Sequence, residues 1–296
     1  MSTEEPDLSY ASYFEHPVKR NVIRAIEKLS GQPKIKKLYN RYLEELKHDT
    51  PFFTAAVKLL EVDVHFNASR LASIPKTGPL VVVANHPFGV LDGIVVCWLV
   101  SLARESDDFK ILTNAALDGI PEARPYLLPV DFSETKEALA ANLQMRKDAM
   151  SLIKHGGCVI VFPSGGVATA PTPFHKTVGE DEWKPFTSNL ITRSEAFVTP
   201  IFFSGQNSRL FQIASHLSIE FRLALIFREV KRKMGKDLFV EIGETLTRDD
   251  LKDVGKRAEL MNFLRDKTYG LAGEDMAERY RIAGEKFAAK KPKVYQ

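Results

Sequence analysis

The chain has 296 residues, of which 44% are hydrophobic and 27% charged, and its formal net charge is +3. This composition excludes a disordered or fibrous chain, and Cys97 and Cys158 sit in apolar runs, which excludes a disulfide framework. The longest apolar stretch, 93–103, is too short to cross a bilayer, and the polar start of the chain is unlike a signal peptide. We therefore expect a cytoplasmic protein that can still lie on a membrane.

The first part of the chain predicts two helices. Apolar residues recur at helical spacing over 17–47, and the segment SGQP at 30–33 interrupts them. Such a helical pair either docks on a domain or lies at a membrane interface. We take residues 1–50 as an N-terminal helical region.

From residue 51 to 275 buried strands alternate with helices, which predicts one α/β domain with a mostly parallel sheet covered by helices. The strand candidates are EVDVHF, PLVVVAN, FKILTN, YLLPVDF, CVIVF, FVTPIFF and LFVEI, and the helix candidates are 93–103, 133–157 with a Ser133 cap, 186–195 and 249–272. Residues 276–296 read as a basic C-terminal tail.

Two segments carry clustered positive charge. Five Lys or Arg residues lie within 228–236, and four lysines lie within 286–293. Clusters of this kind suit an anionic lipid surface or a nucleic acid. The simpler interpretation is a solvated face and a frayed terminus.

The stretch VVVANHPFGVLDG at 81–93 places a histidine directly after a buried strand. His86 can act as a general base near neutral pH, and Asp92 across the turn can orient its ring. The simpler alternative is that Asp92 caps the following helix and His86 is an ordinary turn residue.

A second strand ends in the turn Phe162-Pro163-Ser164-Gly165-Gly166. The carboxyl ends of parallel strands meet at one edge of a sheet, so this turn and His86 are expected to converge there. Gly165 and Gly166 allow backbone N–H groups to face a substrate oxygen or phosphate. A plain strand-to-loop turn explains the same residues.

The sequence lacks the motifs of several other reaction types and binding sites. Ser164 is not preceded by the first glycine of G-x-S-x-G, which disfavours a nucleophilic serine. The chain has no G-x-G-x-x-G, no P-loop and no HExxH, and its seven histidines are scattered. We expect no metal and no bound cofactor.

The two turns together resemble the lysophospholipid acyltransferase family, the glycerolipid O-acyltransferases related to bacterial PlsC. NHPFGVLDG resembles block I of that family, which is Asn-His, four residues and Asp, and IVFPSGG resembles block III, Phe-Pro-Glu-Gly-Thr. LLPVDF lies where block II falls, and FVTPIFF matches the apolar, proline-containing block IV. The order and separation of the blocks agree.

The resemblance implies that His86 deprotonates an acceptor hydroxyl and that Asp92 orients it. The hydroxyl oxygen would then attack an acyl thioester of acyl carrier protein or coenzyme A, without an acyl-enzyme intermediate. The resemblance also implies a peripheral position at the cytoplasmic face of the inner membrane, an anionic membrane surface as partner, and no role for nucleic acid.

This chain departs from the family pattern at three points. Five residues rather than four separate His86 from Asp92, Ser164 stands where the family has glutamate, and Gly166 stands where it has threonine. Block II lacks a match to the arginine that helps bind a glycerol phosphate. The NHPFG…DG form looks closer to members that acylate lyso-aminolipids such as lyso-ornithine lipid, so we prefer such an acceptor over lysophosphatidate.

Further residues are candidates for substrate binding. Asn85 either holds the turn or contacts substrate, and Asn207 and Arg209 follow the block IV strand where a polar head group can bind. Phe88 and the helix 93–103 can line an acyl groove, although core packing is the commoner use of such residues. A lipid or thioester hydrolase and a non-catalytic lipid-binding protein remain alternatives.

Overall fold

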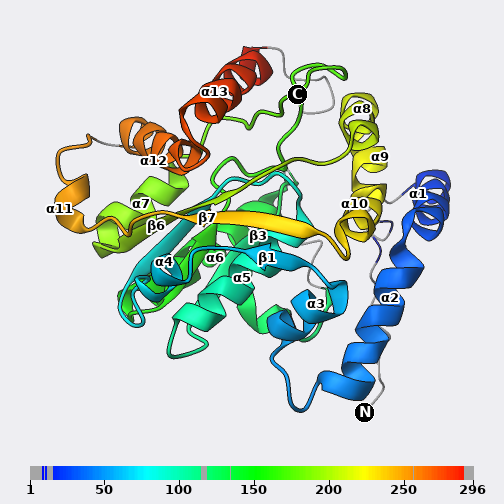
Figure 1. Cartoon of the computed structure of the whole chain (residues 1–296), viewed down its shortest axis with the longest axis horizontal. Coiled ribbons are helices and arrows are strands. Elements are labelled where there is room, and N and C mark those ends of the chain that lie inside the picture. The colour runs from blue at the N-terminus through cyan, green and yellow to red at the C-terminus, as the bar shows by residue number, and fades with distance from the viewer. Residues whose placement is uncertain are drawn as a thin grey trace.

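The computed structural model describes residues 9, 11, 16–114, 119–133, 135–255 and 257–289. Its centre is a seven-stranded sheet in the order β1-β7-β6-β2-β5-β3-β4 (Figure 1). Neighbouring strands are parallel except β6 and β7, which are antiparallel. The expected α/β fold with a mostly parallel, helix-covered sheet is thus confirmed.

The strands correspond to the apolar runs of the sequence. They are β1 Asp63–His65, β2 Leu80–Ala84, β3 Phe109–Asn114, β4 Leu127–Val130, β5 Cys158–Val161, β6 Phe197–Phe203 and β7 Asp237–Ile242. Every residue of β2 and of β5 is buried, as expected for central parallel strands covered on both faces.

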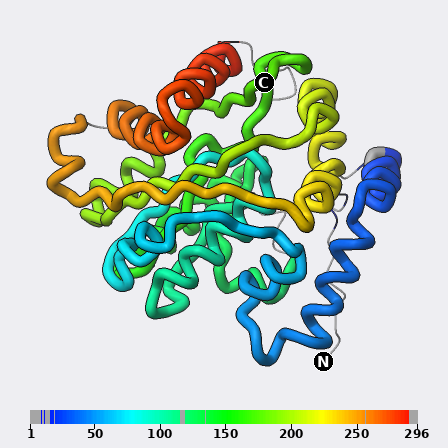
Figure 2. Tube along the Cα trace, viewed as in Figure 1, coloured from blue at the N-terminus to red at the C-terminus, as the bar shows by residue number. Residues whose placement is uncertain are grey.

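Helices fill the connections between the strands and cover both faces of the sheet (Figures 1 and 2). They are α1 Pro17–Ser30, α2 Gln32–Arg41, α3 Phe52–Leu60, α4 Ala68–Ala72, α5 Val90–Ala103, α6 Lys136–Lys154, α7 Phe186–Ser194, α8 Arg209–Leu217, α9 Ile219–Ala224, α10 Ile226–Lys233, α11 Arg248–Leu251, α12 Ala258–Gly270 and α13 Glu274–Ala289. Short helical turns lie at Tyr42–Leu46 (η2) and Arg124–Tyr126 (η4). In the part of the chain just described, no helix is both long and apolar enough to span a bilayer.

Alternation along β2 divides the core into two layers. Leu80 and Val82 pack with residues of α3 and α5, whereas Val81 and Val83 pack with residues of α6, α7 and α12. Side chains point alternately to the two faces of a strand, so one apolar run supplies both layers.

The N-terminal helices form a third apolar cluster with α10. Tyr39 of α2 and Tyr42 pack with Ile226 and Phe227 of α10, and α1 lies against α9 and α10. Figure 2 shows these blue and yellow segments side by side although they are far apart in the sequence. This cluster stands at the edge of the sheet where β2, β5 and β6 end.

Three local predictions are wrong in detail. The helix expected from 93 begins at Val90, and the helix expected from 133 begins at Lys136 with Thr135 as its cap, because Ser133 bonds Asp131 instead. The helix expected over 249–272 is divided into α11 and α12.

The expected boundary at 275 lies near the start of α13. This helix continues through residues that we expected in the basic tail, and its Tyr280 and Phe287 are buried. Lys290, Lys291 and Lys293 of that tail lie outside the described residues. The division into three regions remains a prediction.

Candidate active site

The turns after β2 and β5 lie next to each other. These strands are parallel neighbours, and Val83 pairs with Val161 at their carboxyl ends. The Phe162 ring stacks on the His86 imidazole with centroids 3.9 Å apart and planes 18° apart. The Ala168 N–H donates to the His86 carbonyl over 2.7 Å, so the chain after the second turn continues past the first.

His86 and Asp92 form a hydrogen-bonded pair. The His86 Nδ1 lies 3.0 Å from the Asp92 Oδ2, and the ring nitrogen donates because a carboxylate only accepts. The Asp92 side chain is sealed from solvent, whereas that of His86 is 16% exposed. A fixed Nδ1–H leaves Nε2 as the basic nitrogen.

The same carboxylate oxygen also closes the turn. The N–H groups of Phe88 and Gly89 donate to the Asp92 Oδ2 over 2.8 and 2.9 Å. Gly89 has a φ of +88°, and a side chain there would press on Ile226 and Val167. The sequence leaves open whether Asp92 caps the helix or partners His86. In the structure the same carboxylate does both.

This geometry explains how five intervening residues are accommodated. Helix α5 begins at Val90, so Asp92 is the third residue of its first turn and its carboxylate points back to the preceding chain. The left-handed backbone at Gly89 reverses the chain just before the helix.

The buried carboxylate of Glu180, which the sequence did not indicate, supports the backbone of His86. Glu180 accepts a hydrogen bond from the His86 backbone N–H and another, of 3.0 Å, from the Trp183 Nε1. Burial raises the pKa of Glu180, and the bonds from Trp183 and the His86 N–H act against that rise. The acidic run at 180–182 read as an exposed loop and contained no signal of burial.

Asn85 holds the end of β2 to the end of β6. Its Nδ2 donates to the Phe203 carbonyl over 2.9 Å, and its Oδ1 accepts from the Phe203 N–H over 2.7 Å. The side chain is 3% exposed. Of the two roles considered for Asn85, this arrangement suits holding the turn.

The Ser164-Gly165-Gly166 turn is closed by its own bonds. The Ser164 hydroxyl donates to the Gly166 carbonyl, and the Gly165 N–H donates to the Phe162 carbonyl. The space beside the Cα atoms of Gly165 and Gly166 is open. Among the residues that the structure describes, the Gly166 N–H meets no acceptor, which leaves it available to a substrate oxygen.

The other substrate-binding candidates separate into buried and exposed positions. Phe88 is 1% exposed and belongs to the main core, and Asn207 is buried against the Phe88 carbonyl, to which its Nδ2 donates over 3.4 Å. Arg209 is exposed and donates to the His175 carbonyl. Asn207 is thus part of the buried turn, whereas Arg209 lies at the surface.

The open nitrogen of His86 decides what the pair can do. Apart from the bond to Asp92, the imidazole has no hydrogen bond to any residue described in the structure, Ser164 included. A Ser-His nucleophile pair needs such a bond. The arrangement instead suits a general base that takes its proton from an incoming molecule.

A histidine with two aspartates lies elsewhere in the sheet. His65 of β1 contacts Asp237 and Asp63, and all three side chains are exposed. They lie on the β1–β7 edge, apart from the His86 turn.

Comparisons with known proteins identify the relatives of this chain. A family model described as Acyltransferase matches residues 34–277. A lyso-glycine lipid O-acyltransferase of Bacteroides thetaiotaomicron is 23% identical over 261 residues, which cover 84% of this chain and 89% of that protein. A lyso-glycine lipid O-acyltransferase of Phocaeicola vulgatus is 22% identical over 244 residues, 78% of this chain and 82% of that protein.

A solved structure is also similar to this chain. It is the 1-acyl-sn-glycerophosphate acyltransferase PlsC of Thermotoga maritima, with 17% identity, a TM-score of 0.48, and coverage of 88% of this chain and 84% of that one. The family match spans most of the sequence, including both turns. The chain therefore belongs to this acyltransferase family and is an acyltransferase.

Proposed function

We propose that this enzyme moves a fatty acyl group from a thioester of acyl carrier protein or coenzyme A to the hydroxyl of a lysolipid. The observation that carries the proposal is the open Nε2 of His86, with Nδ1 held by a sealed Asp92 carboxylate. A hydroxyl placed at Nε2 loses its proton to the ring as it attacks.

In this reaction the bonds and the proton balance between the two substrates and the pair. The acceptor oxygen bonds to the thioester carbonyl carbon while Nε2 takes the hydroxyl proton. The carbon–sulfur bond breaks, and the thiolate leaves with the proton from the imidazolium. Asp92 stabilises the imidazolium between these steps.

The acceptor that we favour is a lyso-aminolipid. Two curated relatives carry the name lyso-glycine lipid O-acyltransferase and match most of this chain. The block II segment lacks a clear counterpart of the arginine for a glycerol phosphate. These observations favour the acylated amino acid over lysophosphatidate.

Exposed apolar residues on α1, α8 and α9 support the proposal that the enzyme acts at a membrane surface. Val18, Val22 and Leu29 share one face of α1, and Leu29 is 88% exposed. Leu217, Ile219 and Phe221 are exposed on the adjoining α8 and α9. Exposed apolar groups of this size on neighbouring elements mark an interaction surface.

The position and charge of this surface fit a bilayer of anionic lipid. Arg24 and Lys28 are exposed on α1, to one side of the face that carries Val18, Val22 and Leu29. The same group of helices reaches the active site, since Ile226 of α10 packs beside Gly89. The exposed apolar face thus belongs to helices that pack against the turn carrying His86.

The purified enzyme, incubated with acyl thioester and lysolipid in vesicles, tests the proposal. We expect mass spectrometry to find the diacylated lipid, with a lyso-aminolipid preferred over lysophosphatidate. Free fatty acid formed equally with and without the lysolipid would indicate a hydrolase. Vesicle binding without thioester turnover would indicate a lipid-binding protein.

A further inference from the structure

The last residue of α10 places a cation against the catalytic turn. The Lys233 ammonium lies 4.2 Å from the centroid of the Phe88 ring. Phe88 is the residue whose N–H is held by Asp92 and whose carbonyl accepts from Asn207. Lys233 is thus anchored to the segment that carries His86.

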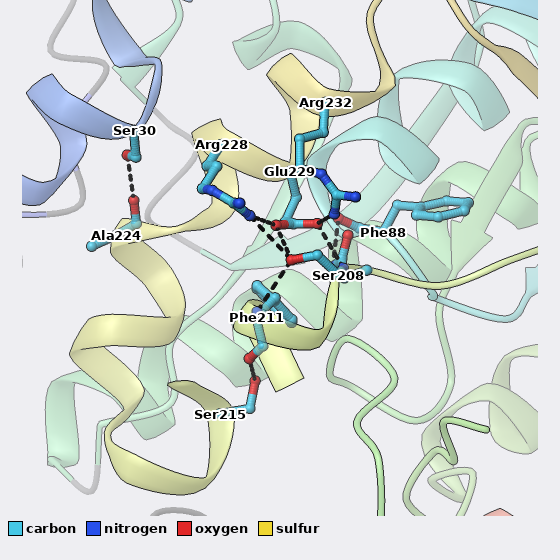
Figure 3. A network of polar contacts seen from close by, with 10 residues as sticks. Ser30, Phe88, Ser208, Phe211, Ser215, Ala224, Arg228, Glu229 and Arg232 are labelled. Carbon is cyan, nitrogen blue, oxygen red and sulfur yellow. Dashed lines mark hydrogen bonds and ion pairs between the residues drawn. The ribbon is translucent and has the colours of Figure 1, made fainter. Parts of the chain in front are cut away.

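Unlike Arg228 and Arg232, Lys233 forms no ion pair with a residue that the structure describes. Figure 3 shows the buried Glu229 carboxylate between Arg228 and Arg232, where it also accepts from Ser208, close to Phe88. Glu229 is thereby saturated. Within the described ranges Lys233 makes no ion pair and no hydrogen bond; its one polar contact is the face of the Phe88 ring.

The Lys233 ammonium loses part of its hydration on folding, and its contacts in the folded chain do not replace all of it. Burial lowers the pKa of the Lys233 ammonium, Lys236 and Arg232 lower it further, and Asp92 and Glu229 oppose them. A cation over an aromatic face recovers only part of the lost hydration. An anion from outside the chain would complete the site.

The donor is poorly placed to supply that anion. In acyl carrier protein and in coenzyme A, the pantetheine arm separates the thioester sulfur from the nearest phosphate. The Lys233 ammonium lies over the ring of Phe88, two residues after His86, so a thioester at His86 puts the donor phosphate elsewhere. The acceptor has its charge close to the reacting hydroxyl. An amino acid with a neutral side chain, such as glycine, is left with one charge, its carboxylate, when its amine is acylated.

We propose that Lys233 binds the carboxylate of the acceptor head group and so selects anionic lysolipids. This inference rests on the proposed lysolipid acyltransferase function and names the group that recognises its acceptor. Arg232, 48% exposed on its side chain beside Glu229, adds positive field at the same place.

The test compares two acceptors, a lysolipid of an N-acylated amino acid and its neutral methyl ester. In Lys233→Met we expect KM for the carboxylate acceptor to rise about tenfold or more, the scale of a charge-assisted hydrogen bond. KM for the ester and KM for the thioester donor should stay within about twofold, and Lys233→Arg should recover most of the affinity. Lys236→Met is the matched control, because it removes an equal charge from the same neighbourhood without contact to the turn.

The outcomes separate this inference from the proposed function. Equal losses with both acceptors, or a rise in KM for the donor, would overturn the carboxylate site while transfer itself persists. Equilibrium binding of both lipids in zwitterionic micelles gives a second readout that needs no turnover. A wild-type enzyme that binds the carboxylate lipid no better than the ester would overturn the site whether or not it transfers acyl groups.

Discussion

Asp92 lies six positions after His86, yet its Oδ2 stands 3.0 Å from the imidazole Nδ1 and accepts two backbone N–H groups of the intervening turn. The pair therefore does not depend on two separately placed side chains. Forming the first turn of α5 places the carboxylate, and the carboxylate then places the histidine. Folding of this one segment assembles the pair that we propose to be catalytic.

Replacing Asp92 should separate its two roles. Asp92→Asn retains an oxygen that can accept from the turn but loses the charge that stabilises an imidazolium. We expect the transfer rate to fall about 10²- to 10⁴-fold with little change in the unfolding free energy. Asp92→Ala should lose the same activity and also about 1–3 kcal/mol of stability, from the orphaned N–H groups. An active Asp92→Asn enzyme would make the carboxylate a helix cap alone.

Glu180 should act as a positioning residue. In Glu180→Gln the amide must turn its NH₂ toward either the His86 N–H or the Trp183 Nε1–H, both of which are donors. We expect kcat to fall about tenfold because the base is displaced, with KM for both substrates retained. Steady-state kinetics checks this. A variant with wild-type kcat would show that the support is not needed.

The same variant has a pH signature. Burial raises the pKa of Glu180, so the folded state favours the protonated carboxyl. The stabilisation from that protonation is present below the unfolded pKa and is lost as the pH rises through the folded pKa. Denaturant unfolding of both proteins should show the stability of the wild type relative to Glu180→Gln decreasing over that window. A difference independent of pH would contradict the raised pKa.

Asn85 should matter for stability more than for substrate affinity. Asn85→Ala leaves the buried backbone N–H and carbonyl of Phe203 without partners, at a cost of about 2 kcal/mol or more. Thermal or denaturant unfolding measures this loss, and KM for both substrates should change little. A KM increase at unchanged stability would instead identify Asn85 as a substrate contact.

The apolar face of α1 and α8–α9 should carry membrane binding. We expect Leu29→Glu and Leu217→Glu each to weaken vesicle binding several-fold, since each inserts a charge where a leucine would enter the lipid. Leu102→Glu is the control. Leu102 is 51% exposed at the far end of α5, about 20 Å from the active-site end of that helix. Equal effects of all three variants would contradict a defined face.

The sequence predicted the sheet well, because its strands are continuous apolar runs and its central helices have clear periodicity. The sequence also predicted that the turns at His86 and Ser164 lie at one edge of the sheet. This requires only that β2 and β5 be parallel neighbours. The antiparallel entry of β7 beside β6 was not predicted, because strand direction depends on the path of α8–α10.

Other parts of the site were not accessible from the sequence. Glu180, Glu229 and Lys233 come from segments that read as a polar loop or a basic cluster, and tertiary packing alone makes them buried or half-buried. Phe88 and Asn207 looked like substrate contacts, yet both side chains are buried in the packing of the turn. Residue type and spacing indicate the base and its partner. The residues that support them are brought there by contacts between positions more than 80 apart in the sequence.

The most direct test of the account is acyl transfer by His86→Ala, compared with the wild type and with His155→Ala, an exposed histidine at the end of α6. Formation of the diacylated lipid from a lyso-aminolipid and an acyl thioester is measured, with circular dichroism to check the fold. The account predicts that His86→Ala stays folded and binds vesicles but transfers at least about 10³-fold more slowly, and that His155→Ala is unaffected. Transfer at the wild-type rate by a folded His86→Ala enzyme would contradict it.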